Sequence, residues 1–275
     1  MGTTPGVPRA RVESQGAAVH EAVTYAERRG YRPLLLDLHV PAGAGPVPVV
    51  VWIHGGAFWE GDRRYMPPTV APGAVFDALT AAGLAVATVD YRLSGEASFP
   101  AQLDDVRAAV TFLTENADRY GLDPRRIGVW GESAGGTLAG LTALTHPGIG
   151  AAALWYAVND LATPALADPA RPEAVLFGDL PPDELRARTT EWSLENKVTP
   201  AAPPFLLVHG TADVPVPVSH SERLHARLEA AGVRSEYLPV QDAGHIFEGY
   251  DRIPELIGTT AAYLARELAA PAVRA

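Results

Sequence analysis

The sequence of 275 residues contains no cysteine. Without thiols the chain cannot form disulfides, use a thiol nucleophile, or bind zinc or iron–sulfur clusters through thiolates. Lysine is almost as scarce, because Lys197 is the one lysine among 22 basic residues, so a lysine-dependent phosphate loop or Schiff base has a single candidate. No apolar run approaches the roughly 18 residues that a membrane-spanning helix requires. The N-terminal arginines are not followed by the apolar stretch of a signal peptide.

Positive charge is in deficit, since 32 acidic residues against 22 Lys and Arg give a formal net charge of −10. Such a surface repels nucleic acid and anionic membranes. We therefore expect a cytoplasmic enzyme that acts on a small molecule, with no nucleic-acid or membrane partner, and leave a homo-oligomer open. The 26 glycines and 25 prolines indicate a chain rich in loops.

Short apolar runs alternate with amphipathic ones along the chain. Continuous apolar runs such as residues 49–53 and 205–208 are typical of parallel strands buried on both faces. The predicted strands are 19–26, 34–40, 47–53, 84–90, 127–130, 151–157, 205–209 and 235–240. The predicted helices are 72–82, 101–120, 133–145, 218–231 and 254–268. This order predicts an α/β fold with a mostly parallel sheet of about eight strands flanked by helices.

The domain is expected to span residues 17–275, after a flexible N-terminus at 1–16. Residues 158–204 are rich in proline and show a weak helical pattern around 182–193. Long segments of this kind in a compact domain commonly form lids or binding loops. We interpret this segment as a short cap inserted over the C-terminal edge of the sheet.

The segment Gly131-Glu132-Ser133-Ala134-Gly135 contains Gly-x-Ser-x-Gly between a predicted strand and a predicted helix. The glycines permit a turn so tight that side chains there would clash, and the serine Oγ is lifted clear of the sheet. Its position at a helix N-terminus favours developing negative charge. Ser133 is therefore the candidate nucleophile, in preference to a simple N-cap residue.

A nucleophilic serine needs a base and an orienting carboxylate. Among the eight histidines, His245 lies in a glycine-bearing loop just after the last predicted strand. Asp213 follows the strand that ends at 209, at the edge where α/β active sites assemble. The order Ser133, Asp213, His245 is the order of α/β-hydrolase triads. Asp242 is the rival acid, although a single Asp on a turn is usually a turn former.

The turn His54-Gly55-Gly56-Ala57 directly follows the strand that ends at 53. In this context backbone amides point inward and bind an oxyanion together with the amide of the residue after the serine. The predicted oxyanion donors are therefore Gly56, Ala57 and Ala134. Three aromatic residues near these turns are the predicted substrate contacts, in a pocket expected to be mostly apolar. They are Phe58, Trp59 and Phe247.

Together with Asp90-Tyr91-Arg92-Leu93-Ser94, Phe99-Pro100-Ala101-Gln102 and His209-Gly210-Thr211-Ala212-Asp213, these motifs resemble the α/β-hydrolase superfamily. The nearest resemblance is to carboxylesterases of the hormone-sensitive-lipase-like and bacterial feruloyl-esterase-like branch, over roughly residues 20–268. It implies an α/β-hydrolase fold and ester hydrolysis through an acyl-serine, with no metal or organic cofactor. Two features depart from the lipase-like pattern: alanine stands where a third glycine is usual after the histidine, and we expect no long N-terminal cap segment.

Three other functions remain open at this point. An amidase such as an arylformamidase would use the same triad, and an acyltransferase would pass the acyl group to another alcohol. A non-catalytic ligand-binding member of the fold is the third reading, although such a protein has no need of a complete triad.

Overall fold

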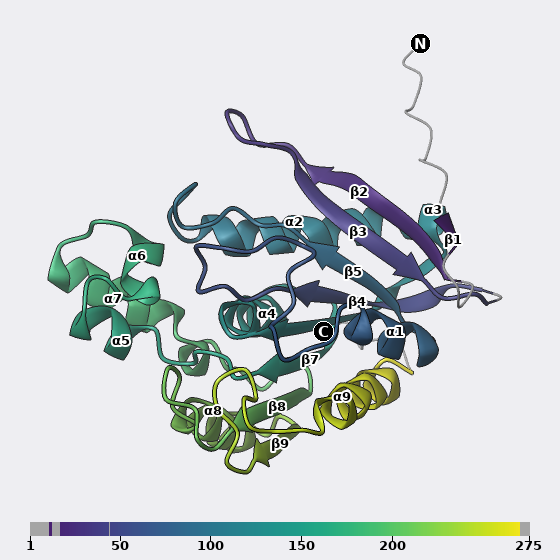
Figure 1. Ribbon diagram of the computed structural model, residues 1–275. Coiled ribbons are helices and arrows are strands. Elements are labelled where there is room, and N and C mark those ends of the chain that lie inside the picture. The colour runs from purple at the N-terminus through teal and green to yellow at the C-terminus, as the bar shows by residue number, and fades with distance from the viewer. Residues whose placement is uncertain (1–10, 13–16, 44, 270–275) are drawn as a thin grey trace.

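The computed structural model describes residues 11–12, 17–43 and 45–269, in which a nine-stranded sheet is covered by helices on both faces (Figure 1). The strand order is β1-β2-β3-β5-β4-β6-β7-β8-β9. The first four strands in this order pair antiparallel, and β5, β4 and β6 to β9 run parallel. The strands are β1 (Arg11–Val12), β2 (Ala18–Ala26), β3 (Leu34–Val40), β4 (Val47–Ile53), β5 (Ala85–Val89), β6 (Leu122–Glu132), β7 (Ile149–Trp155), β8 (Phe205–Gly210) and β9 (Ser235–Val240).

The helices divide into two covering layers and a group inserted after β7. Helices α1 (Ala74–Ala81) and α9 (Ile253–Glu267) pack on one face of the sheet. The opposite face carries α2 (Ala101–Glu115), α3 (Ala117–Tyr120), α4 (Ala134–Thr145) and α8 (Ser219–Ala230). The inserted group comprises α5 (Ala162–Ala167), α6 (Pro172–Phe177), α7 (Pro182–Trp192) and the 3-10 helix η1 (Leu194–Asn196).

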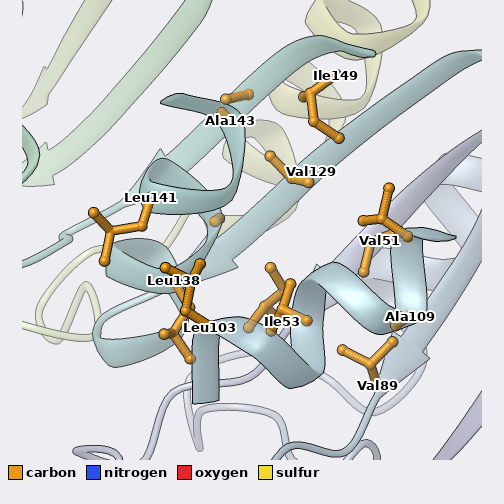
Figure 2. Packing of buried hydrophobic residues seen from close by; sticks show 14 of the residues in the cluster. Val51, Ile53, Val89, Leu103, Ala109, Val129, Leu138, Leu141, Ala143 and Ile149 are labelled. Carbon is orange, nitrogen blue, oxygen red and sulfur yellow. The ribbon is translucent and has the colours of Figure 1, made fainter. Parts of the chain in front are cut away.

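Strand β4 shows why the central strands are apolar without interruption. Val51 and Ile53 face the layer of α2 and α4, where Leu103 and Leu138 pack against the same face (Figure 2). Trp52, one residue out of phase, belongs to the core under α1 and α9. Burial of each such side chain contributes roughly 1.5–3 kcal/mol to the free energy of unfolding. Because both faces of the strand are buried, it lacks the alternation of apolar and polar residues that a half-exposed strand shows.

Because β4 to β9 are parallel, the turns that follow them lie along one edge of the sheet. The turn after β4, the turn from β6 into α4 and the loops after β8 and β9 therefore meet at this edge, as expected for an α/β active site. Helices α5, α6 and α7 lie together beyond one end of the sheet, away from α1 and α9 (Figure 1). They occupy the segment 158–204 that we interpreted as a cap.

The expected α/β architecture is confirmed, and the eight predicted strands correspond to β2–β9. The ninth strand, β1, has two residues and was not predicted, nor were the short helices α5 and α6. Apart from β1, the predicted flexible N-terminus lies outside the described residues. No helix in the described part of the chain is both long and apolar enough to cross a bilayer.

Candidate active site

Ser133 lies at the junction of β6 and α4 in a backbone conformation that L-residues rarely adopt, with φ 52° and ψ −121°. Gly131 and Gly135, which flank this serine, are required because there is no room for a side chain at either position. A Cβ on Gly131 would lie 2.1 Å from the carbonyl oxygen of Gly135, and one on Gly135 would lie 2.1 Å from that of Ile53. The Ser133 amide donates to the Trp155 carbonyl of β7 at 2.9 Å, which holds the strained turn against the sheet. The serine side chain is consequently set at the edge of the sheet.

The structure brings Ser133, His245 and Asp213 into one hydrogen-bonded row. His245 Nε2 lies 2.9 Å from Ser133 Oγ, and His245 Nδ1 lies 2.7 Å from Asp213 Oδ2. The Asp213 side chain is fully buried, whereas that of His245 is 18% exposed. Asp242, the rival acid, is exposed, has φ 57° and serves the turn after β9. Asp213 is therefore the carboxylate that orients the imidazole.

Asp213 is also hydrogen-bonded to His209, which is hydrogen-bonded in turn to Ser221. His209 Nε2 lies 3.1 Å from Asp213 Oδ2 and 2.9 Å from the Val216 carbonyl, so this nitrogen carries the proton and donates. Its other nitrogen, Nδ1, lies 2.7 Å from Ser221 Oγ and accepts from that hydroxyl. Burial alone would raise the pKa of the Asp213 carboxyl, but hydrogen bonds from His209 and His245 hold it below the usual value. The row of side chains thus runs from Ser221 through His209 and Asp213 to His245 and Ser133.

The loop after β4 carries three consecutive residues with positive φ: Gly56 at 90°, Ala57 at 54° and Phe58 at 65°. It closes as a tight turn in which the amides of Trp59 and Glu60 donate to the Gly56 carbonyl. Within the described residues, the amides of Gly56 and Ala57 donate to no protein acceptor. This loop is next to the nucleophile turn, because Ile53 at the end of β4 pairs with Gly131 of β6.

The three aromatic residues predicted to contact substrate differ in exposure. Trp59 is 44% exposed, whereas Phe58 is 1% exposed and Phe247 is fully buried. Phe247 packs edge-to-face against Trp155 and Tyr156. The burial of Phe58 and Phe247 places them among the core side chains beneath the site, and of the three only Trp59 presents a large surface to a ligand. Their role as substrate contacts stays a prediction.

Sequence reasoning missed three side chains of this site: His209, Ser221 and Glu132. The first two support the triad acid, and the third lies under the loop after β4. One signal for Glu132 was present in the sequence, because a carboxylate directly after the apolar run 127–131 needs a specific partner if it is buried. His209 likewise ends an apolar strand and reaches Asp213 four residues later.

The family model described as BD-FAE matches residues 36–228 of this chain. Among curated proteins, "Esterase LipC" of Mycobacterium tuberculosis is 31% identical over 225 residues, which cover 75% of this chain and 54% of that protein. "Carboxylesterase NlhH" of the same species is 33% identical over 169 residues, covering 59% of this chain and 49% of that protein. The chain thus spans about half the length of these relatives.

Among solved structures, a "truncated form of carbohydrate esterase from gut microbiota" superposes with a TM-score of 0.83 at 25% identity. The similarity covers 95% of this chain and 100% of that one. It confirms the α/β-hydrolase fold, and the sequence matches confirm the resemblance to the hormone-sensitive-lipase-like and feruloyl-esterase-like branch. Since the matching family model spans most of the sheet and both turns of the site, the chain belongs to the BD-FAE family.

Proposed function

We propose that this protein is a serine hydrolase that cleaves carboxylic esters of small or medium acyl groups through an acyl-serine intermediate. The observation that carries the proposal is the hydrogen-bonded row of Ser133, His245 and Asp213 at a strained strand-to-helix turn. The names of the two mycobacterial relatives, an esterase and a carboxylesterase, support the same activity.

The first half of the reaction forms the acyl-serine. His245 Nε2 accepts the Ser133 proton as Oγ attacks the ester carbonyl, and Asp213 fixes the imidazole tautomer and stabilises its charged form. The amides of Gly56, Ala57 and Ala134 bind the oxyanion of the tetrahedral intermediate. His245 then donates the proton to the departing alcohol.

The second half releases the acid. Water enters, His245 accepts its proton, and the hydroxide attacks the acyl-serine carbonyl, so that a second tetrahedral intermediate forms in the same oxyanion hole. Collapse of this intermediate expels Ser133 Oγ, which regains its proton from His245. Because the triad supplies both the nucleophile and the proton transfers, the cycle returns the protein to its starting state.

Hydrolysis of p-nitrophenyl esters from acetate to decanoate, by the wild type and by Ser133→Ala, tests the proposal. We expect saturable hydrolysis by the wild type, with the optimum chain length reporting the size of the acyl pocket, and loss of at least about 10³-fold in kcat in the variant. Wild-type inactivity on the whole series would refute a general esterase. Matched anilides and added alcohols would then test an amidase and an acyltransferase.

A cytoplasmic location, expected from the sequence, is a further part of this proposal. Fractionation of producing cells with an antibody to the protein would test it.

A further inference from the structure

Glu132, the residue immediately before the nucleophile, is 2% exposed and points beneath the loop after β4. Its Oε1 accepts a hydrogen bond from the Gly55 amide at 2.6 Å. A carboxyl that ends β6 is thereby tied to the loop that leaves the neighbouring strand β4. A bond of this length to a carboxyl oxygen is at the strong end of the range for proteins.

The space around Gly55 matches this contact. A Cβ on Gly55 would lie 2.1 Å from Glu132 Oε1 and 2.6 Å from Glu132 Cδ. Gly55 does not belong to the residues with positive φ, so its backbone conformation would accept a side chain. Glycine is therefore required at this position by the carboxyl of Glu132 and not by the course of the chain.

Two carbonyl groups of the same loop are held by a second side chain, Tyr91. Tyr91 Oη donates to the carbonyls of His54 and Gly55 at 3.0 and 3.2 Å, and the His54 ring stacks on the Tyr91 ring at 4.3 Å. Because a peptide unit is planar, fixing the Gly55 carbonyl also fixes the direction of the Gly56 N–H, which points the opposite way. The loop is thus clamped at one amide by Glu132 and at two carbonyls by Tyr91.

Glu132 also lies close to the catalytic base. Burial raises the pKa of Glu132 to about 7, against the lowering effects of the Gly55 amide, His245 and the Tyr156 hydroxyl. The Tyr156 ring packs edge-to-face on the His245 ring, with the centroids 5.0 Å apart. Within the part of the chain that the structure describes, no other ionisable side chain accepts from the Gly55 amide. The acceptor oxygen of Glu132 is therefore the feature that a substitution must preserve or remove.

We propose that Glu132 is a positioning residue for the oxyanion hole: its carboxyl oxygen, by accepting the Gly55 N–H, holds the Gly56 and Ala57 amides in the direction of the developing oxyanion. This inference rests on the esterase function proposed above. Glu132 touches neither the substrate nor the reacting atoms and acts through the loop. Its loss should therefore weaken binding of the transition state more than binding of the ester.

The test compares Glu132→Ala with Glu132→Gln, which keeps an acceptor oxygen at the same reach. With p-nitrophenyl acetate we expect Glu132→Ala to lower kcat by about 10- to 100-fold, which is less than the 10²–10³ for removing a donor outright. KM should change by less than about 2-fold, because ground-state binding is unaffected. Affinity for an arylboronic acid, which forms a tetrahedral adduct on Ser133, should fall in parallel with kcat. Glu132→Gln should stay within about 3-fold of wild type in all three quantities.

A second route reaches the same bond from its other partner. Gly55→Ala forces a methyl group into the space of the carboxyl and should lower kcat with little change in KM. In the Glu132→Ala background that space is vacant, so adding Gly55→Ala should cost less than it does in the wild type. A smaller cost in the double variant is the coupling expected of two groups in direct contact. If Glu132→Ala fails to fold, Gly55→Ala alone tests the inference, and a wild-type kcat in Gly55→Ala would then overturn it.

Several outcomes would overturn the inference. They are a wild-type kcat in Glu132→Ala, a loss in Glu132→Gln as large as in Glu132→Ala, and additive effects of the two substitutions. The first would mean that the loop needs no anchor, and the second that charge and not the acceptor matters. Failure of the esterase proposal is distinct, since it would show as inactivity of the wild type or as full activity of Ser133→Ala.

Discussion

Ser221→Ala should lower the stability of the protein without lowering its catalytic rate, because Ser221 reaches Asp213 only through His209. The Ser221 hydroxyl donates to His209 Nδ1 at 2.7 Å, and the His209 side chain is fully buried. Removing the hydroxyl leaves this nitrogen without a donor in the core, which should lower the free energy of unfolding by about 1–3 kcal/mol. The catalytic rate should hardly change, because His209 Nε2 still donates to Asp213 and to the Val216 carbonyl.

Urea unfolding and steady-state hydrolysis of p-nitrophenyl acetate measure the two effects on the same preparation. Ser219→Ala is the matched control, since Ser219 lies on the same helix and is exposed, so its unfolding free energy should stay within about 0.5 kcal/mol of wild type. We expect kcat of Ser221→Ala to remain within about 3-fold of wild type. Unchanged stability, or a large fall in kcat without loss of stability, would refute the hydrogen-bond direction derived for His209.

Four further predictions follow from individual residues. Asp213→Asn replaces an acceptor for two histidine donors by an amide and should lower kcat by on the order of 10⁴-fold without unfolding the protein, as steady-state kinetics and circular dichroism would show. Gly135→Ala should prevent folding, because its Cβ would lie 2.1 Å from the Ile53 carbonyl oxygen, and the loss of soluble protein on expression would show it. Gly258→Ala, in open space on α9, should instead stabilise the protein by up to about 1 kcal/mol in urea unfolding. Burial lowers the pKa of His54 from 6.5 to about 4. The unfolded chain therefore binds a proton at His54 that the folded protein does not, and the free energy of unfolding should fall by about 3 kcal/mol between pH 6.5 and pH 4. His54→Gln should remove that part of the pH dependence in urea unfolding, and an unchanged dependence would contradict the prediction.

The strands could be predicted from the sequence because each central strand is an apolar run bounded by glycine, proline or charge. Strand β6 was predicted too short, at 127–130 instead of Leu122–Glu132. Its first half contains Asp123, Pro124 and two arginines, and it pairs with β4 through a register shift. Hydrophobic periodicity could not detect that half, since its pairing is set by the neighbouring strand.

The juxtaposition of Ser133, His245 and Asp213 could be predicted because each residue follows a recognisable strand and their order along the chain fits a triad. The supporting residues could not be. Glu132 meets Gly55 across 77 positions of sequence, and the role of His209 depends on which of its nitrogens faces Asp213. Such roles are set by the packing of separate segments, and no local pattern records them. The burial of Phe58 and Phe247 likewise depends on packing between separate segments, so the sequence could not reveal it.

Covalent labelling tests the central claim, that Ser133 is the nucleophile, most directly. The protein would be incubated with diethyl p-nitrophenyl phosphate, its intact mass measured, and the modified peptide sequenced. The account predicts one diethylphosphoryl group per chain, on Ser133 Oγ. Ester hydrolysis should be lost at the same rate as the label is incorporated, and Ser133→Ala should take up no label. Labelling of another residue, or an unlabelled wild type that hydrolyses esters, would contradict it.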